Sequence, residues 1–450
     1  MNRPTLCILL LLSMLTLQAK NYDITAYGAK SDTTILSTAA LQQCIDLCSQ
    51  AGGGCVVVPA GNYKIGTVIL KSNVHLHLEL GATLYGSTDL KDYQRMKSDY
   101  LSLRTHTETV QLIYADSAEN IVIDGYGTID GRGSVFPKLS WNDEGITRPH
   151  LLRFIQSRNI TIKDITLKNS GCWMQHYLAC DRLRIDGIKV TNRNNYNNDA
   201  LDLDGCHDVV ISNMIADSDD DGITLKSTSP RLCEDITIEN CIVSSHCNAV
   251  KLGTETNGGF RNITIHGIVV KPSADQSSQF FGRPIGSSAL SLEIVDGGVM
   301  ENINISDFTV TGTESPIFVR LGHRGRGWMP NQKIEKTGSI HDVNIGHIYV
   351  RNAGRYGCSI TGLPGHPVEN IRVKDISIHH QGGINADSLI SIHKAIQDEK
   401  VAEYPEATMW GPLPAKGFYV HHARGVILEN ITIDTVLPDE RPLIVREDDM

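Results

Sequence analysis

The stretch Asn159-Ile160-Thr161-Ile162 is one copy of a short motif whose repetition decides the fold. The motif is a polar residue or Gly, an aliphatic residue, any residue and a second apolar residue. Other copies begin at Asn120, Arg182, Asp208, Asp235, Asn262, Asn302, Asp342, Asn370 and Gly425. The copies from residue 159 to residue 262 are 23, 26, 27 and 27 residues apart, and three later intervals reach 40, 40 and 55 residues. Short strands at this period, without amphipathic helices between them, predict an all-β right-handed parallel β-helix with loops inserted in the longer intervals.

A β-sandwich or a β-propeller is the alternative fold for so many short strands. Propeller blades repeat at about 40–50 residues and turn through hairpins, which the central spacing does not match. By length alone, 450 residues would suggest about three domains. A solenoid grows by adding coils and needs no second core, so we expect one catalytic domain over residues 20–450.

Two features precede the first repeat. An amphipathic stretch that starts at Ala39-Ala40-Leu41-Gln42 and ends at Gly52-Gly53-Gly54 predicts a short N-terminal capping helix, because an uncovered sheet edge invites aggregation. Residues 1–19 are typical of a signal peptide, with Arg3, an apolar run from Cys7 to Leu17 and a small residue at Ala19. We therefore expect an exported protein, periplasmic or secreted.

Charge and hydropathy limit the possible partners. The formal net charge is −10 and becomes −11 without Arg3, and no basic stripe offsets it, which disfavours nucleic acid. The apolar run in the signal peptide is too short to span a bilayer, and the sequence has no other candidate span, so we expect no membrane insertion. We also expect a monomer.

Cysteine spacing agrees with stacked coils. Cys180, Cys206 and Cys233 each lie three residues before the apolar residue of their motif, so they should share one register as a ladder of buried thiols. Cys44, Cys48 and Cys55 could hold one disulfide, whose partners the sequence does not choose. The 11 cysteines show no zinc-binding spacing, and no cofactor fingerprint is visible.

Two acidic clusters lie about one coil apart. Asn197-Asn198-Asp199 leads into the strand Leu201-Asp202-Leu203, and Asp219-Asp220-Asp221 leads into Ile223-Thr224-Leu225. Aligning the two strands puts Asp199 and Asp221 in one register, on strands ~4.8 Å apart. Carboxylates this close cannot all ionise freely, so one can keep a proton to donate while two hold water. The alternative is that each Asp only caps a strand.

Further motifs carry a family resemblance. They are Tyr27-Gly28-Ala29-Lys30, Val56-Val57-Val58-Pro59-Ala60-Gly61-Asn62-Tyr63, Leu80-Gly81-Ala82-Thr83-Leu84, Gly125-Tyr126-Gly127-Thr128-Ile129-Asp130-Gly131, Arg148-Pro149-His150 and Asn169-Ser170-Gly171-Cys172-Trp173 with His176. Together with the acidic clusters, they resemble glycoside hydrolase family 28, the polygalacturonases and rhamnogalacturonan hydrolases, over nearly the whole mature chain. The resemblance implies inverting hydrolysis of pectic poly- or oligosaccharides, without a cofactor or metal. It implies Asp220 as the general acid, with Asp199 and Asp221 on the attacking water.

The next coil departs from the family pattern. Asn248 takes the position of the family's His and can orient the site only by hydrogen bonds. Two interpretations of His246 stay open: it partly substitutes for that His, or it lies in a turn. Lys226 and Lys251 should both point into the groove. They either bind the carboxylate of a uronic acid or neutralise acids such as Asp202 and its neighbour Asp204.

A second departure concerns substrate binding. The family's Arg-Ile-Lys is replaced by approximately Ser291-Leu292-Glu293, so both basic residues are absent. Loop arginines could replace them, because an Arg fork suits a planar carboxylate, or could simply be solvated. The candidates are Arg283, Arg320, Arg324 and Arg326. Insertions around 272–288, 312–338 and 384–418 could close one end of the groove, which favours exo action. Their aromatic residues offer faces for sugars: Trp328, Tyr404, Trp410 and Phe418.

Two other functions remain open. A β-helix lyase or epimerase on acidic polysaccharide would need a basic residue such as Lys226 or Lys251 as its base. A non-catalytic carbohydrate-binding or adhesive solenoid would fit the loss of Arg-Ile-Lys and the Asn at 248, although the three Asp residues argue against it.

Overall fold

The polar residue that opens each repeated motif turns the chain at a coil corner. In the computed structural model, which describes residues 20–140, 142–275 and 284–447, Asn120, Asn159 and Asn262 have φ values of 58°, 54° and 53°. Asn tolerates this left-handed conformation better than most residues. Its side chain also bridges coils, since Asn159 Nδ2 donates to Asn120 Oδ1 at 2.9 Å. The repeated motif therefore marks a corner followed by a strand.

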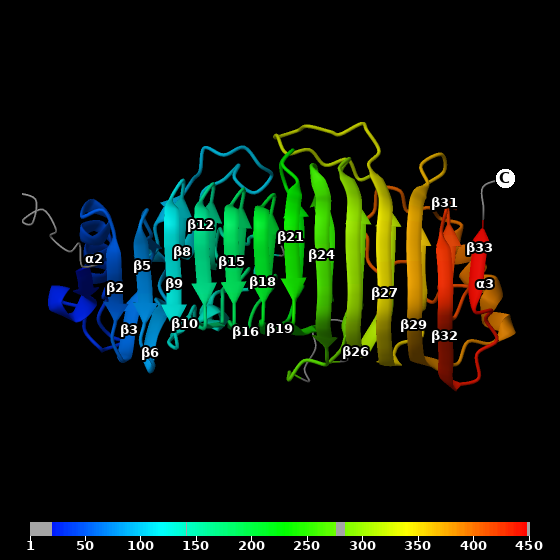
Figure 1. Ribbon diagram of the computed structural model, residues 1–450, viewed down its shortest axis with the longest axis horizontal. Helices are drawn as coiled ribbons and strands as arrows, with labels where there is room; N and C mark the ends of the chain where they lie inside the picture. The colour runs from blue at the N-terminus through cyan, green and yellow to red at the C-terminus, as the bar shows by residue number, and fades with distance from the viewer. Residues whose placement is uncertain (1–19, 141, 276–283, 448–450) are drawn as a thin grey trace, which may run out of the picture.

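The strands stack in three parallel columns along a right-handed β-helix (Figure 1). The first column holds the site described below and contains β4 (Val68–Ile69), β8 (Thr109–Asp116), β11 (His150–Ile155), β14 (Gln175–Leu178), β17 (Leu201–Asp204), β20 (Ile223–Ser227), β23 (Asn248–Thr256), β25 (Gly286–Ile294), the end of β26 (Val299–Leu321), β28 (Cys358–Thr361), β30 (Phe418–His421) and β33 (Ile444–Glu447). The second column contains β1 (Lys20–Asp23), β2 (Gly54–Val58), β5 (Val74–Leu78), β9 (Glu119–Gly125), β12 (Arg158–Lys163), β15 (Asp181–Asp186), β18 (His207–Ser212), β21 (Cys233–Glu239), β24 (Gly259–Val270), β26, β27 (Ser339–Ala353), β29 (Val368–Gly382), β31 (Ala423–Arg424) and β32 (Ile427–Leu437).

The third column contains β3 (Gly61–Ile65), β6 (Ala82–Gly86), β10 (Thr128–Asp130), β13 (Thr166–Lys168), β16 (Lys189–Asn192), β19 (Ile215–Ser218) and β22 (Ile242–Ser245). From β24 onward, single long strands bend from the second column into the third. The two-residue β7 (Arg95–Met96) pairs antiparallel with β8. Short 3₁₀ turns are η1 (Ile24–Tyr27), η2 (Leu90–Asp92) and η3 (Gly133–Val135).

The core is a continuous row of aliphatic side chains along the helix axis. The first apolar residue of each motif points inward, and Ile160, Leu183 and Ile263 are at most 2% exposed. The thiols of Cys180, Cys206 and Cys233 are likewise buried, at the starts of adjacent strands of the second column, which confirms the predicted ladder. Each coil thus buries its apolar side against its neighbours.

A helix lies at each end of the solenoid (Figure 1). Helix α2 (Thr38–Gln50) covers the first coil with buried residues such as Leu41 and Ile45, which confirms the predicted cap. Helix α3 (Ala386–Ile396) falls in a stretch that the sequence marked only as an insertion. Asn385 caps it by accepting a hydrogen bond from the Ser388 backbone N–H at 3.0 Å, and Ile392 and Ile396 are its buried residues.

The prediction that Cys44, Cys48 and Cys55 hold one disulfide is wrong. Cys44, Cys48 and Cys55 are all free, as are the other cysteines of the described ranges. Cys44 and Cys48 lie on the inner side of α2, where they pack as small apolar side chains. The predicted signal peptide at residues 1–19 lies outside the described residues. Among the helices of residues 20–140, 142–275 and 284–447, none is long and apolar enough to cross a membrane.

Candidate active site

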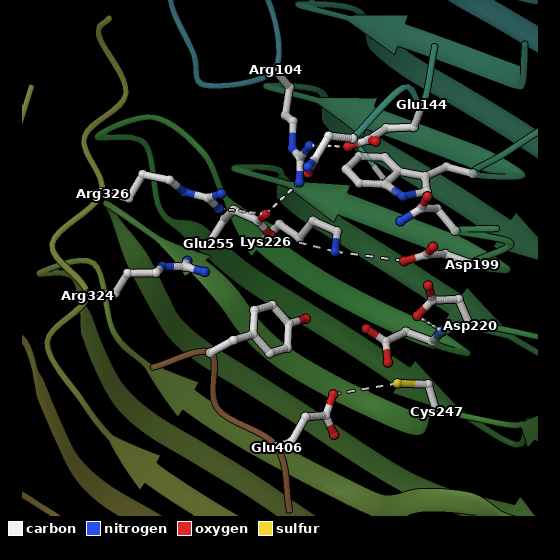
Figure 2. A pocket seen from close by; sticks show the side chains of 15 residues that line it. Arg104, Glu144, Asp199, Asp220, Lys226, Cys247, Glu255, Arg324, Arg326 and Glu406 are labelled. Carbon is white, nitrogen blue, oxygen red and sulfur yellow. Dashed lines mark hydrogen bonds and ion pairs between the residues drawn. The ribbon is translucent and has the colours of Figure 1, made fainter. Parts of the chain in front are cut away.

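A cavity of about 360 Å³ opens on the outer face of the first column, where both acidic clusters lie (Figure 2). Its lining side chains come from four successive coils and from four loops. They are Arg104, Asn142, Glu144, Trp173, Asn197, Asp199, Asp220, Asp221, Lys226, Cys247, Glu255, Arg324, Arg326, Tyr404 and Glu406. The register between β17 and β20 pairs Leu201 with Ile223, which places Asp199 next to Asp221 as the sequence predicts.

Asparagine side chains build the turn that presents Asp199. Asn198 Oδ1 accepts from the backbone N–H of Asn194 at 2.8 Å, and its Nδ2 donates to the Cys172 carbonyl at 3.0 Å. Asn192 Nδ2 donates to the backbone carbonyl of Asp199 at 2.9 Å. The carboxylate of Asp199 is thereby held in place while its Oδ1, which is buried, has no hydrogen-bond partner among the described residues. The residue itself lines the cavity beside Asp221.

Two serines hold the tight turn of the second cluster. The hydroxyls of Ser218 and Ser245 donate to the Asp220 carbonyl at 3.0 and 2.7 Å. The backbone N–H of Asp221 donates to Asp220 Oδ1 at 2.9 Å. Successive residues of this turn therefore present two carboxyl groups to one cavity.

Asp221 is held by the following coil. Asn248 donates to Asp221 Oδ1 from its backbone N–H at 3.0 Å and from Nδ2 at 2.8 Å. Ser287 and Ser288 fix Asn248 in turn, because their hydroxyls donate to its Oδ1 at 2.9 and 2.7 Å. Lys251 Nζ lies 3.1 Å from Asp221 Oδ2 and 3.0 Å from the Tyr404 hydroxyl. Asn248 and Lys251 thus position an ionised Asp221.

Lys226 occupies the centre of a second buried ion cluster. Its Nζ lies 3.4 Å from Asp202, 3.7 Å from Glu255 and 3.8 Å from Asp199. It also lies 4.9 Å from the centre of the Trp173 ring. Both lysines therefore neutralise carboxylates of the protein itself. This favours the neutralising role over the alternative, in which the two lysines bind the carboxylate of a uronic acid.

The protonation states of the three Asp residues differ for clear reasons. Burial, with the neighbouring charge of Asp221, raises the pKa of Asp220 to about 7. Burial and then Asp202 raise the pKa of Asp199 well above its usual value. Burial opposes ionisation of Asp221 too, but Lys251, Lys226 and the Asn248 hydrogen bond outweigh it and lower its pKa. Asp221 is therefore held as an anion beside an Asp220 that keeps a proton near neutral pH.

Three arginines lie across the cavity from Asp220 (Figure 2). Arg104 and Arg326 both contact Glu255 Oε1, at 2.5 and 2.8 Å, and Arg104 also contacts Glu144. Burial alone would raise the pKa of Glu255, but Arg104, Lys226 and Arg326 lower it well below its usual value. Glu255 therefore joins Arg104, Arg326 and Lys226 into one ionic wall of the cavity.

The remaining wall is formed by neutral and acidic groups. Burial raises the pKa of Glu406, and raises that of Glu293 to about 8, so Glu293 favours its protonated form at neutral pH. The Cys247 thiol donates to Glu406 Oε1 at 3.7 Å, and Ser291 donates to Glu293 at 2.5 Å. Ser291 pairs with Lys251 in register, so the strand that should carry Arg-Ile-Lys supplies hydrogen-bonding groups here.

Comparison with known proteins decides the family. The profile of glycosyl hydrolases family 28 matches residues 48–398. The chain belongs to glycosyl hydrolase family 28. It is 24% identical over 385 residues to a probable polygalacturonase of Vitis vinifera, covering 82% of this chain and 76% of that protein. It is also 24% identical over 378 residues to exopolygalacturonase X-1 of Emericella nidulans, covering 80% and 84%. A family 28 exopolygalacturonase structure from Yersinia enterocolitica shares the fold, with a TM-score of 0.71 at 17% identity over 96% of this chain and 78% of that one.

Family 28 membership makes the protein a glycoside hydrolase, and the structure shows which expected residues reach its cavity. Arg324 and Arg326 line it, whereas Arg320 is buried and donates to the Gly362 carbonyl. His246 lies between β22 and β23 with its Nδ1 2.7 Å from Asp219 Oδ1, so it contacts Asp219 instead of lining the cavity. Arg283 lies outside the described residues.

Of the aromatic residues in the insertions, Tyr404 lines the family 28 cavity. Phe418 is fully buried in the solenoid core, and Trp410 is nearly buried and packs with α3, where Arg320 lies 5.0 Å from its ring centre. These two rings serve local packing, because apolar loop residues must be covered where a long insertion folds back on the coils.

Several cavity residues of this hydrolase are absent from the sequence prediction. Trp173 belongs to a motif that carries the family resemblance, and Glu255 follows Lys251 in the same strand. The sequence around each of these two residues could therefore have identified it as a cavity residue. No such local pattern marks Arg104 and Glu406. Arg104 reaches Glu255 across 151 residues of sequence, and Glu406 reaches Cys247 across 159.

The acidic group does not fit a metal ion. Ligand atoms of Asp220, Asp221 and Cys247 lie within 4.8 Å of one another. The ammonium group of Lys251 is already 3.1 Å from Asp221 and would repel a cation. Burial also raises the pKa of the Cys247 thiol well above its usual value, so it stays protonated. The donor set therefore supports acid–base chemistry by the protein's own carboxyl groups.

Proposed function

We propose that this enzyme is an inverting, exo-acting hydrolase of acidic pectic oligosaccharides. The observation that carries the proposal is the placement of Asp199, Asp220 and Asp221 on one side of a cavity whose other side is formed by arginines. The names of two compared proteins, exopolygalacturonase X-1 and the Yersinia exopolygalacturonase, support the same substrate class and mode of action.

The three Asp residues take different roles in this mechanism. Asp220 is the general acid and protonates the leaving glycosidic oxygen, since its raised pKa keeps it protonated near neutral pH. Asp221 is the base, because its lysine and amide partners keep it ionised. Asp199 lines the cavity beside Asp221 and orients the attacking water toward it. Water then attacks from the face opposite the leaving group, which inverts the anomeric carbon.

The arginine wall and the loop that carries Tyr404 give the cavity two means of selecting a substrate. Arg326, which shares Glu255 with Arg104, has guanidinium donors left for the carboxylate of a uronic acid. Tyr404 and Glu406 stand on a loop from the 384–418 insertion and restrict the cavity on another side. A restricted cavity accepts a chain end more readily than the middle of a polymer, which supports exo action.

A lyase or epimerase mechanism is disfavoured by the lysines. Lys226 and Lys251 would have to act as neutral bases. Burial alone would lower the pKa of each, but their carboxylate neighbours outweigh it and raise both pKa values, so both stay charged. A charged ammonium group cannot abstract a proton.

The test is a time course on polygalacturonate, rhamnogalacturonan backbone and short oligomers of each. We expect single sugars to accumulate from oligomers, and proton NMR to show the inverted anomer first. Asp220→Asn should lower kcat by ~10²–10⁴-fold with the fold intact. The matched control is Asp219→Asn, whose carboxylate contacts His246 and does not line the cavity, and it should keep most activity. A ladder of product sizes would refute exo action, and equal loss in both variants would refute the role of Asp220.

Cellular location completes the proposal. We propose that residues 1–19 are removed on export and that the mature chain from residue 20 acts as a monomer and a single catalytic domain in the periplasm or medium. N-terminal sequencing of the protein recovered from the periplasm and medium, with light scattering of the purified protein, checks this. An intact Met1 or a dimeric mass would contradict it.

A further inference from the structure

A second group of titratable side chains lies far from the cavity, on the outer face of the second column. His75 and His77 stand on β5, and Asp124 stands on β9 of the next coil. Alternate residues of a strand point to the same side, and the intervening Leu76 is fully buried, so both histidines face outward. The register pairs His77 directly with Asp124.

The three side chains converge on one point. His75 Nε2 lies 2.7 Å from Asp124 Oδ1, and His77 Nδ1 lies 2.6 Å from the same oxygen. The imidazole rings are nearly perpendicular, with an interplanar angle of 80° and centres 5.7 Å apart. Two ring nitrogens and one carboxylate oxygen thus lie within 4.8 Å of one another.

We propose that His75, His77 and Asp124 form a binding site for Zn²⁺. Zinc binds imidazole nitrogen and carboxylate oxygen at about 2.0–2.2 Å, so tetrahedral ligand atoms lie roughly 3.3 Å apart. The present distances of 2.7 and 2.6 Å need to open by only about 0.6–0.7 Å. All three side chains are partly exposed, which gives them room to move and gives the ion a path from solvent. Water completes the fourth position.

The surroundings favour zinc over magnesium or calcium, which prefer sites made of oxygen alone. Cys55 on β2 pairs with His75 in register, from the strand on the other side of β5. Burial, with the nearby charge of Asp124, raises the pKa of the Cys55 thiol to about 11, so Cys55 stays protonated at neutral pH and the ligands are His75, His77 and Asp124.

The site would join two coils that a long connection separates. Residues 79–118 run between β5 and β9, and the ligands come from both strands. An ion bound only by the folded chain stabilises it, so zinc should strengthen the N-terminal coils. The three ligands do not line the catalytic cavity, so the inference is independent of the proposed hydrolase mechanism.

The test is calorimetric titration of the full mature protein, stripped with a chelator, with ZnCl₂. We expect one ion per chain and a melting temperature that rises with zinc. Asp124→Asn, and separately the double variant His75→Gln with His77→Gln, should weaken binding at least ~10-fold. The matched control is His266→Gln, because His266 contacts a single carboxylate, Glu239, at 3.3 Å on an outer strand. It should bind zinc like the native protein.

Two results would overturn the proposal. One is native protein that takes up no zinc, and the other is equal affinity in the native protein and the double variant. If the ligand variants fail to fold, the native protein still decides the question. One equivalent of Cu²⁺ should then give an electron paramagnetic resonance spectrum with coupling to two imidazole nitrogens, and a spectrum without that coupling would refute the site.

Discussion

Replacing Lys251 by Met should move the acid limb of the pH–activity profile to higher pH. Lys251 Nζ lies 3.1 Å from Asp221 Oδ2, and both side chains are at most 4% exposed. At that distance and an effective dielectric constant of about 20, the pair interacts by roughly 5 kcal/mol. At about 1.4 kcal/mol per pKa unit, this corresponds to an upper bound of roughly four units.

The observed shift should be smaller than the bound. Lys226 and Asn248 remain beside Asp221 and still favour its ionised form. We expect the pKa of Asp221 to rise by about 1–3 units, the range typical of an Asp that gains or loses one close cation. The base is needed ionised, so kcat/KM in the variant should begin to fall at a pH about 1–3 units higher than in the native enzyme.

The assay is kcat/KM against pH on the best oligomer, with circular dichroism to confirm folding at each pH. The matched control is Tyr404→Phe, which removes the hydroxyl 3.0 Å from Lys251 Nζ without changing any charge at neutral pH. Its acid limb should stay near the native position. A folded Lys251→Met enzyme with an unchanged acid limb would refute the assignment of Asp221 as the base held ionised by Lys251.

Three further predictions follow from the same structure. Activity should fall as pH rises through about 7, because Asp220 must keep its proton, and Asp220→Asn should abolish this basic limb in any residual activity. Arg326→Gln should raise KM for acidic oligomers more than for carboxyl-reduced ones, and equal changes would argue against a carboxylate contact. Ile263→Ala, in the fully buried core row, should lower the free energy of unfolding by about 2–5 kcal/mol in urea titrations, whereas a change below 1 kcal/mol would contradict its burial.

The fold and the acidic groups were predictable because they rest on local sequence patterns. A corner residue such as Asn159 and the aliphatic residue after it recur once per coil, and strand pairing between coils follows from that period. The same register argument placed Asp199 beside Asp221 and Asn248 beside Asp221, as the hydrogen bonds of Asn248 show. Adjacent coils stack in order, so neighbours in space could be found by subtraction along the sequence.

The structure of the insertions, unlike that of the repeated coils, was not predictable from the sequence. Nothing in the stretch 384–418 indicated that α3 would pack on the last coils or that Tyr404 would reach Lys251. The roles of Lys226 and Lys251 also stayed open, because a lysine that faces a groove can bind a substrate or neutralise a buried acid. Only the measured distances to Asp202 and Asp221 decide for neutralisation.

The solenoid, the N-terminal cap and the meeting of three carboxyl groups on one face follow from local patterns of residues. Which of these carboxyl groups is ionised, which arginines reach the cavity and how Glu255 joins Arg104 to Arg326 follow only from the folded chain. The physical reason is the separation along the chain of the residues that interact. Repeats are read from spacings of about one coil, whereas protonation and binding depend on burial and on charges brought together by loops that are distant in the chain.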